Sequence, residues 1–181
     1  MLWILLSVVL AILIALIVLY NSLVLEGWSG IAVQLQRRSD LIPNLLATVQ
    51  GYLTHERDLL NEVTALRARA QSLGDQHPAE RAATDGLLGA ALGRLIAVAE
   101  SYPDLKASAN VLEFQESLEA IESELQLARH YYNGAARQYN IAVEQFPSNL
   151  VAGGFGFEPA ELFTLDDPSD AAVPKVSFTR G

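Results

Sequence analysis

Residues 2–19 form a run of eighteen amino acids without a single charge, in which only Ser7 is polar. A helix of this length reaches the lower end of what is needed to cross the hydrocarbon core of a bilayer. It also satisfies its own backbone hydrogen bonds, so it can lie in lipid alone. Because no face of the run is polar, a helix buried in a soluble core fits poorly. We therefore predict a transmembrane anchor over residues 1–25.

A cleaved signal peptide is the main alternative for this run. Such peptides begin with Lys or Arg and end in a small-x-small cleavage site. Here no Lys or Arg precedes the run, and the segment after it reads YNSL at residues 20–23. An uncleaved anchor is therefore favoured. Arg37 and Arg38 follow the run, so the positive-inside rule places the bulk of the chain in the cytoplasm.

The rest of the chain is acidic, with 21 Asp and Glu against 12 Lys and Arg and a net charge of −9. Nucleic-acid binding needs a basic surface, so we expect no nucleic-acid partner. Anionic lipid would repel such a domain. The chain has no Cys, which excludes disulfides, thiolate chemistry and metal sites built from Cys.

Three helical stretches are predicted after the anchor, at about 28–73, 78–101 and 110–146. In each, apolar residues recur at alternating intervals of three and four, the period of helix bundles and coiled coils. Pro43 should kink the first stretch near Ser39. Pro78 and Glu80 should begin the second, and Asn110 with Glu113 has the spacing of a capping box for the third.

These patterns predict an all-α fold, an antiparallel bundle of three to four helices with long coiled-coil-like members over residues 26–147. The predicted core positions of the first stretch are Ile31, Leu35, Arg38, Ile42, Leu45, Val49, Tyr52, Glu56, Leu59, Val63, Leu66, Ala70 and Leu73. Those of the other two are Leu88, Leu92, Leu95, Ala99, Tyr102, Val111, Phe114, Leu118, Ile121, Leu125, Ala128, Tyr132, Ala135, Tyr139, Ala142 and Phe146.

The first stretch would be about 69 Å long against about 36 Å for the second, so part of its apolar seam would lack cover. A second copy of the chain or the bilayer could provide it, and a homo-oligomer is one expectation. A chain reversal at Pro43 or Gly51 would reduce the need.

The tail, residues 148–181, has two parts. Its first part carries aromatic and aliphatic side chains that should pack on the bundle or lie in the membrane interface. They are Phe155, Phe157, Leu162 and Phe163. Its far part, with Asp166, Asp167 and Asp170 among prolines, is predicted to be disordered.

Several blocks in order along residues 20–157 resemble the LemA family. They include VQLQRRSDLIPNL at 33–45, YPDLK at 102–106, ARHYYN at 128–133 and FPSN at 146–149. The resemblance implies a bacterial inner-membrane protein with one span, a small outside N-terminus and a helical-bundle domain. It implies no reaction, and it suggests membrane proteases or envelope-stress components as partners.

Motifs for chemistry are largely missing from the sequence. His55-Glu56 opens like a zinc-protease helix, but Leu59 stands where the second histidine belongs. A di-iron bundle needs Glu three residues before His, whereas Tyr52 and Leu127 precede His55 and His130. We therefore predict no catalytic residue, no metal, no cofactor and no enzyme. The alternative, a bundle that binds a metal or small molecule, would need a buried pocket with converging polar groups.

Two groups of polar residues are candidates for binding a partner. The first, Arg37, Arg38, Asp40 and Asn44, surrounds Pro43. It is either a polar notch for another protein or an internal arrangement. In the internal arrangement, Arg38 pairs with a bundle carboxylate while Asp40 or Asn44 satisfies backbone groups freed by the proline.

The second group is a strip of carboxylates at helical spacing, with no Lys or Arg between them. Its members are Glu113, Glu116, Glu119 and Glu122, followed by Glu124. Like charges three residues apart repel each other on a helix. The strip is either a solvated face or a docking surface for a basic partner. Together these features favour a membrane-anchored interaction or scaffold protein of the bacterial envelope.

Overall fold

The computed structural model describes residues 1–73 and 77–164, and within them every regular element is a helix. The helices are α1 (Leu2–Val49), α2 (Arg57–Ser72), α3 (Pro78–Ala99), α4 (Pro103–Lys106), α5 (Ala109–Glu144) and α6 (Ser148–Phe155). The predicted all-α fold class is confirmed. The disorder predicted around Asp166, Asp167 and Asp170 lies outside the described residues.

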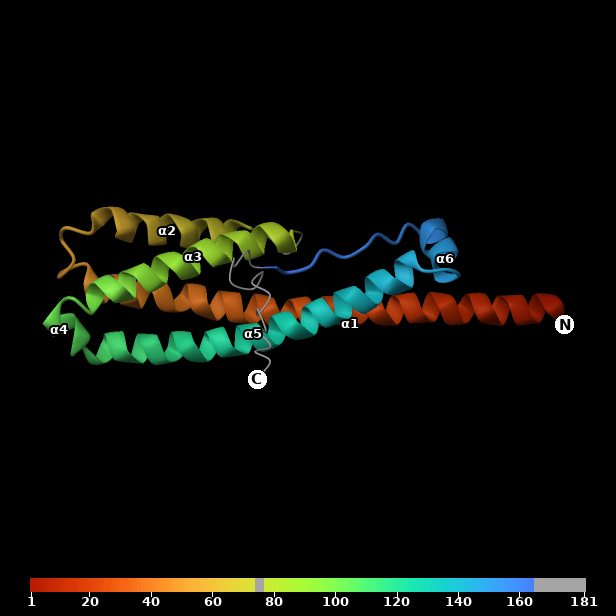
Figure 1. Ribbon diagram of the computed structural model, residues 1–181, viewed down its shortest axis with the longest axis horizontal. Helices are drawn as coiled ribbons and strands as arrows, with labels where there is room; N and C mark the ends of the chain where they lie inside the picture. Colours follow the sequence, from red (N-terminus) through yellow and green to blue (C-terminus); the bar gives the residue numbers. More distant parts are fainter. Residues whose placement is uncertain (74–76, 165–181) are drawn as a thin grey trace, which may run out of the picture.

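Helix α1 is continuous from the apolar run into the bundle, and α5 runs antiparallel along it (Figure 1). Gly27 permits this close pairing. A Cβ atom at Gly27 would lie 3.0 Å from the Cα of Tyr132, so a larger residue would push α5 away. The apolar run and the first bundle helix are therefore one continuous helix.

The prediction of one helix over residues 28–73 is wrong. Helix α1 ends at Val49, and α2 begins at Arg57 after a reversal in which Leu53 is buried. Gly51 lies in this turn, at one of the two positions considered for a reversal. Tyr52 is consequently half exposed and not core. The reversal shortens the first helix, and its seam from Ile31 to Val49 is covered by the chain's own helices, while a homo-oligomer stays a prediction.

Pro43 does not end α1, which continues through it to Val49. A proline lacks the N–H that would bind the carbonyl four residues earlier, which here is Ser39. Arg67 of α2 supplies the missing donor, since its Nε donates to the Ser39 carbonyl oxygen at 2.8 Å. The repair predicted for Asp40 or Asn44 is therefore wrong, and it comes from a residue 28 positions away.

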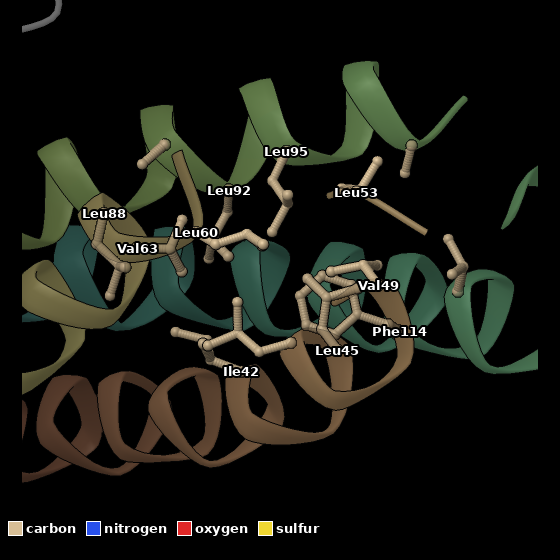
Figure 2. Packing of buried hydrophobic residues seen from close by; sticks show 14 of the residues in the cluster. Ile42, Leu45, Val49, Leu53, Leu60, Val63, Leu88, Leu92, Leu95 and Phe114 are labelled. Atoms are coloured by element: carbon tan, nitrogen blue, oxygen red, sulfur yellow. The ribbon is translucent and has the colours of Figure 1, made fainter. Parts of the chain in front are cut away.

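The apolar core has two parts along the rod. The first joins the C-terminal half of α1 to α2, α3, α4 and the start of α5. Figure 2 shows Ile42, Leu45 and Val49 of α1 facing Leu88, Leu92 and Leu95 of α3. The second joins the N-terminal half of α1 to the end of α5, α6 and the tail.

Most core positions predicted for α3 and α5 are confirmed, including Leu88, Leu95, Leu125 and Tyr132. Six others are only half-buried, and Phe146 is exposed (79%) because it lies beyond the last turn of α5. The half-buried ones are Tyr102, Leu118, Ile121, Ala128, Ala135 and Ala142. The predicted start of the second stretch at Pro78 is confirmed, while the predicted caps from Glu80 and from Asn110 with Glu113 are wrong. Neither α3 nor α5 has a side-chain cap from its own first turn, and α5 begins after Ser108, which places Asn110 inside the helix.

Two helices among the described residues are long and apolar enough to cross a membrane, α1 and α3. In α3, 44% of the most apolar window is buried inside the bundle, which is typical of a core helix. In α1 only 6% of that window is buried. The apolar run of α1 is therefore the segment that indicates membrane anchoring.

The tail after α6 forms a strap, residues 157–164, along α5. The Asn140 amide donates to the Ala160 carbonyl at 3.0 Å and accepts from the Ala160 N–H at 2.7 Å. Asn133, two turns earlier, makes the same pair of bonds to Phe163. Phe163 is buried against Trp28, with ring centroids 5.9 Å apart, as predicted for packing on the bundle. Phe155 is exposed and does not share this packing.

Replacing Asn140 with Ala should release this strap. Both backbone groups of Ala160 would lose their partners, at a cost of about 1–3 kcal/mol in the free energy of unfolding. Cleavage by a glutamate-specific protease after Glu161 should become faster. Asn61→Ala, an exposed residue of α2, is the matched control and should leave cleavage unchanged. Equal cleavage of the two variants would mean that the strap is not held by these amides.

Candidate functional site

A buried polar layer separates the two parts of the core. At its centre is Arg38 of α1, whose side chain is 6% exposed. Its Nη1 donates to Oδ2 of Asp85 at 2.8 Å, and Asp85 in α3 is equally buried. Its Nη2 pairs with Glu122 of α5, which is partly exposed. Arg38 thus joins three helices, and this is the internal pairing considered for it from the sequence.

Gly89 of α3 makes room for this guanidinium. A Cβ atom at Gly89 would lie 2.7 Å from Nη2 of Arg38, closer than real Cβ contacts come. Gly89 lies one turn after Asp85, so one helix supplies both the carboxylate and the space.

Burial raises the pKa of the Asp85 carboxyl above its ordinary value of 3.8, although the adjacent Arg38 guanidinium opposes the rise. More distant cationic groups of Arg129 and Arg81 act in the same sense as Arg38. Desolvation therefore outweighs the ion pair at this position. The layer links helices within the chain, and its central cation, Arg38, is almost entirely covered by them.

The other members of the first predicted group face solvent. Arg37 and Asp40 are exposed on α1, and Asp40 accepts a hydrogen bond from Gln36 at 2.7 Å. Asn44 is also exposed, one turn further along the helix. The structure therefore separates Arg38 from its three neighbours in the predicted notch.

An open groove of about 350 Å³ lies between α1 and α5, in the half of the bundle far from the apolar run. Apolar side chains of Leu41, Leu45 and Phe114 line it together with polar ones from both helices. The polar residues are Asn44, Thr48, Asn110, Glu113 and Ser117. One residue from each predicted group, Asn44 and Glu113, thus lines the same groove.

The carboxylate strip is divided by the structure. Glu113, Glu116 and Glu119 are exposed on α5, and within residues 1–73 and 77–164 none of them has a Lys, Arg or His partner within 4 Å. Glu122 turns inward to Arg38. Of the three, only Glu113 lines the groove, and Glu116 and Glu119 follow on α5 outside its lining. We call the groove with Glu113 at its edge the acidic groove. It joins an apolar floor to uncompensated negative charge.

Sequence reasoning missed Asp85 and Gly89 as the partners of Arg38. Asp85 could have been found from the sequence, because an acidic residue just before the apolar stretch that begins at Leu87 suggests a buried partner for a cation. Asn133 and Asn140 were missed as well. Their spacing of seven residues puts them on one face of α5, which suits two contacts with one extended strap.

The histidines do not gather. His55 lies in the turn after α1, His77 precedes α3 and His130 is exposed on α5. Among the described residues, no group of three or more His, Asp or Glu side chains could hold a metal ion.

The model of the LemA family matches residues 27–178, which begins just after the apolar run and includes the whole bundle. The protein LemA of Metamycoplasma hominis is 28% identical over 121 residues, covering 67% of this chain and 54% of that protein.

Magnetosome proteins are among the other relatives. MamQ 2 of Paramagnetospirillum magneticum is 28% identical over 169 residues, and MamQ of Magnetospirillum gryphiswaldense is 25% identical over the same length. Each alignment covers 80% of this chain and 62% of the relative, so the chain spans about three-fifths of their length.

Proposed function

The chain belongs to the LemA family, and from this membership and its fold we propose that it is a membrane-anchored interaction protein. Family and apolar helix together indicate a membrane-associated protein. In our proposal the bundle performs no chemistry of its own and binds another protein through the acidic groove. The bilayer in question is the bacterial inner membrane.

The proposed orientation places the bundle in the cytoplasm. Arg37 is exposed on α1 after the apolar run, and Lys and Arg near a span favour the cytoplasmic side. The acidic groove lies between the C-terminal part of α1 and the start of α5. Figure 1 shows these two segments at the end of the bundle far from the N-terminus of α1. A partner of this protein could therefore bind the groove without contacting the lipid headgroups.

The acidic groove is the observation that supports a binding role. An apolar floor with charge on its rim suits an amphipathic segment that carries basic residues beside its apolar ones. Glu113 at the groove would attract such a segment, and exposed Glu116 and Glu119 further along α5 would add longer-range attraction that raises its rate of association. We therefore propose a basic amphipathic segment of another envelope protein as the occupant, with membrane proteases and envelope-stress components as candidate classes.

Neutralising the strip tests this proposal. The triple variant Glu113→Gln, Glu116→Gln, Glu119→Gln changes only exposed side chains, so it should keep the fold. Proteins cross-linked to the full chain in native membranes should be identified by mass spectrometry. We expect at least one protein captured by the wild type to fall to background in the variant, because its basic side chains lose their partners.

The matched control removes three exposed carboxylates elsewhere, through Glu26→Gln, Asp58→Asn and Glu100→Gln. It changes the net charge by the same amount and should leave capture intact. If the wild type, the triple variant and the control capture the same proteins equally, or capture none, the groove has no binding role. If the cross-linked products contain only this chain, the partner is a second copy of it, and the proposal of a different protein as partner is wrong.

A further inference from the structure

Large apolar side chains are exposed together around α6. Phe146, Leu150 and Phe155 are 79%, 68% and 62% exposed. The same short helix buries Val151 and Ala152 against the core. Helix α6 therefore packs one side on the core, while Leu150 marks its bare side and Phe146 and Phe155 are exposed near its two ends.

The bare side lies at the level of the apolar run. Val151 and Ala152 belong to the same core cluster as Ile17 of α1, with Leu13 and Ile14 packed beside it. These α1 residues are within residues 2–19, and Leu13 precedes Leu19 by six residues, or about 9 Å along the helix. Figure 1 shows α6 beside the N-terminal part of α1, beyond the main bundle.

The composition around α6 suits lipid at that level. Residues 146–157 contain no Asp, Glu, Lys or Arg. The nearest charged residues, Glu144 and Glu158, flank the segment on both sides and are exposed. Tyr20 follows the apolar run directly, and tyrosine rings favour the headgroup level. Three exposed large apolar groups would be unfavourable in water and favourable in the acyl region.

We propose that α6, together with Phe146, is an interfacial membrane element that lies at the headgroup–acyl boundary of the bilayer spanned by α1. This rests on the anchoring in the proposed function and extends it. Since α6 packs on both α1 and α5, the bundle would meet the membrane at two points. Two attachments on one packed unit would fix the direction in which the acidic groove faces.

The natural lack of Cys allows a direct test by nitroxide labelling. Leu150→Cys and Phe155→Cys are made separately, labelled, and reconstituted as the full chain in phosphatidylcholine vesicles. Power-saturation electron paramagnetic resonance compares collisions with oxygen and with a water-soluble nickel chelate. Both labels should favour oxygen, at a depth of about 5–10 Å. Leu127→Cys, 65% exposed on α5 away from the run, should favour nickel.

A label at Val9→Cys, within the apolar run, distinguishes the possible failures. If the Val9 label collides mainly with oxygen while the labels at Leu150 and Phe155 collide mainly with nickel, the interfacial element is wrong and the anchor stands. An aqueous Val9 label would overturn both the element and the proposed anchoring. Labels at Leu150 and Phe155 that are shielded from both reagents and show dipolar broadening would place a second copy there, which also overturns the lipid contact.

Discussion

Arg38→Ala should lower the free energy of unfolding by about 3–5 kcal/mol, because it leaves the buried Asp85 carboxylate without its cation. The Asp85 side chain is only 5% exposed and cannot turn to water without opening the bundle. Glu122 is less affected, since its side chain is 37% exposed. Urea unfolding of the full chain in detergent micelles, followed by circular dichroism, measures the loss.

The neighbouring Arg37→Ala is the control, since Arg37 is exposed and makes no ion pair within the described residues. It should change stability by less than about 0.5 kcal/mol. The double variant Arg38→Met, Asp85→Leu should recover most of the loss, because apolar residues of similar volume remove both buried charges. Arg38→Ala that behaves like Arg37→Ala would show that the polar layer does not join the helices.

The loss should also depend on pH. The raised folded-state pKa of Asp85 means that this group favours the fold most when protonated, and its contribution is lost as pH rises through that pKa. Arg38 opposes the rise, so its removal moves the pKa further upward. The difference between wild type and Arg38→Ala should therefore grow as pH rises above the raised pKa of Asp85 in the wild type, and level off above its still higher pKa in the variant.

Leu125→Ala should cost about 2–5 kcal/mol, because it leaves a cavity in the core that joins α1 to α5. Leu125 is fully buried in the cluster that also contains Trp28, Ile31 and Tyr132. The same urea measurement applies. A loss below about 1 kcal/mol would mean that α5 does not bury this face against α1.

Leu127→Ala removes the same atoms from the same helix two residues later. Its side chain is 65% exposed, so its replacement should change stability by less than about 0.5 kcal/mol. The contrast between the two variants separates core packing from any change in helix propensity, because both replace Leu with Ala within α5.

Helix identity and the inward face of α5 could be predicted because one period repeats over its whole length. Leu125, Tyr132 and Tyr139 follow the three-four spacing and are buried as expected. The same spacing misled at residues 50–56, where Tyr52 and Glu56 keep the rhythm but the chain turns. A repeating period shows which face of a helix is apolar, but it does not show whether the helix is continuous. In this segment only Gly51 indicated a break.

The polar layer could not be predicted in full because its members are far apart in sequence. Arg38 stood out as a cation in an apolar seam, but its partner Asp85 is 47 residues away on another helix. The repair of Pro43 by Arg67 is another long-range contact. The acidic groove could be predicted only in part. Asn44 and Glu113 were both predicted to bind a partner, but in separate groups, and only the antiparallel register of α1 and α5 brings them together.

We propose that one end of the molecule meets lipid while the other binds a protein. This proposal can be tested by placing a diazirine amino acid in native membranes either at Ser117, in the acidic groove, or at Leu150, on α6. We expect protein adducts of defined mass from Ser117 and lipid adducts from Leu150. Protein adducts at Ser117 no more abundant than at the exposed Leu127, or an absence of lipid at Leu150, would contradict it.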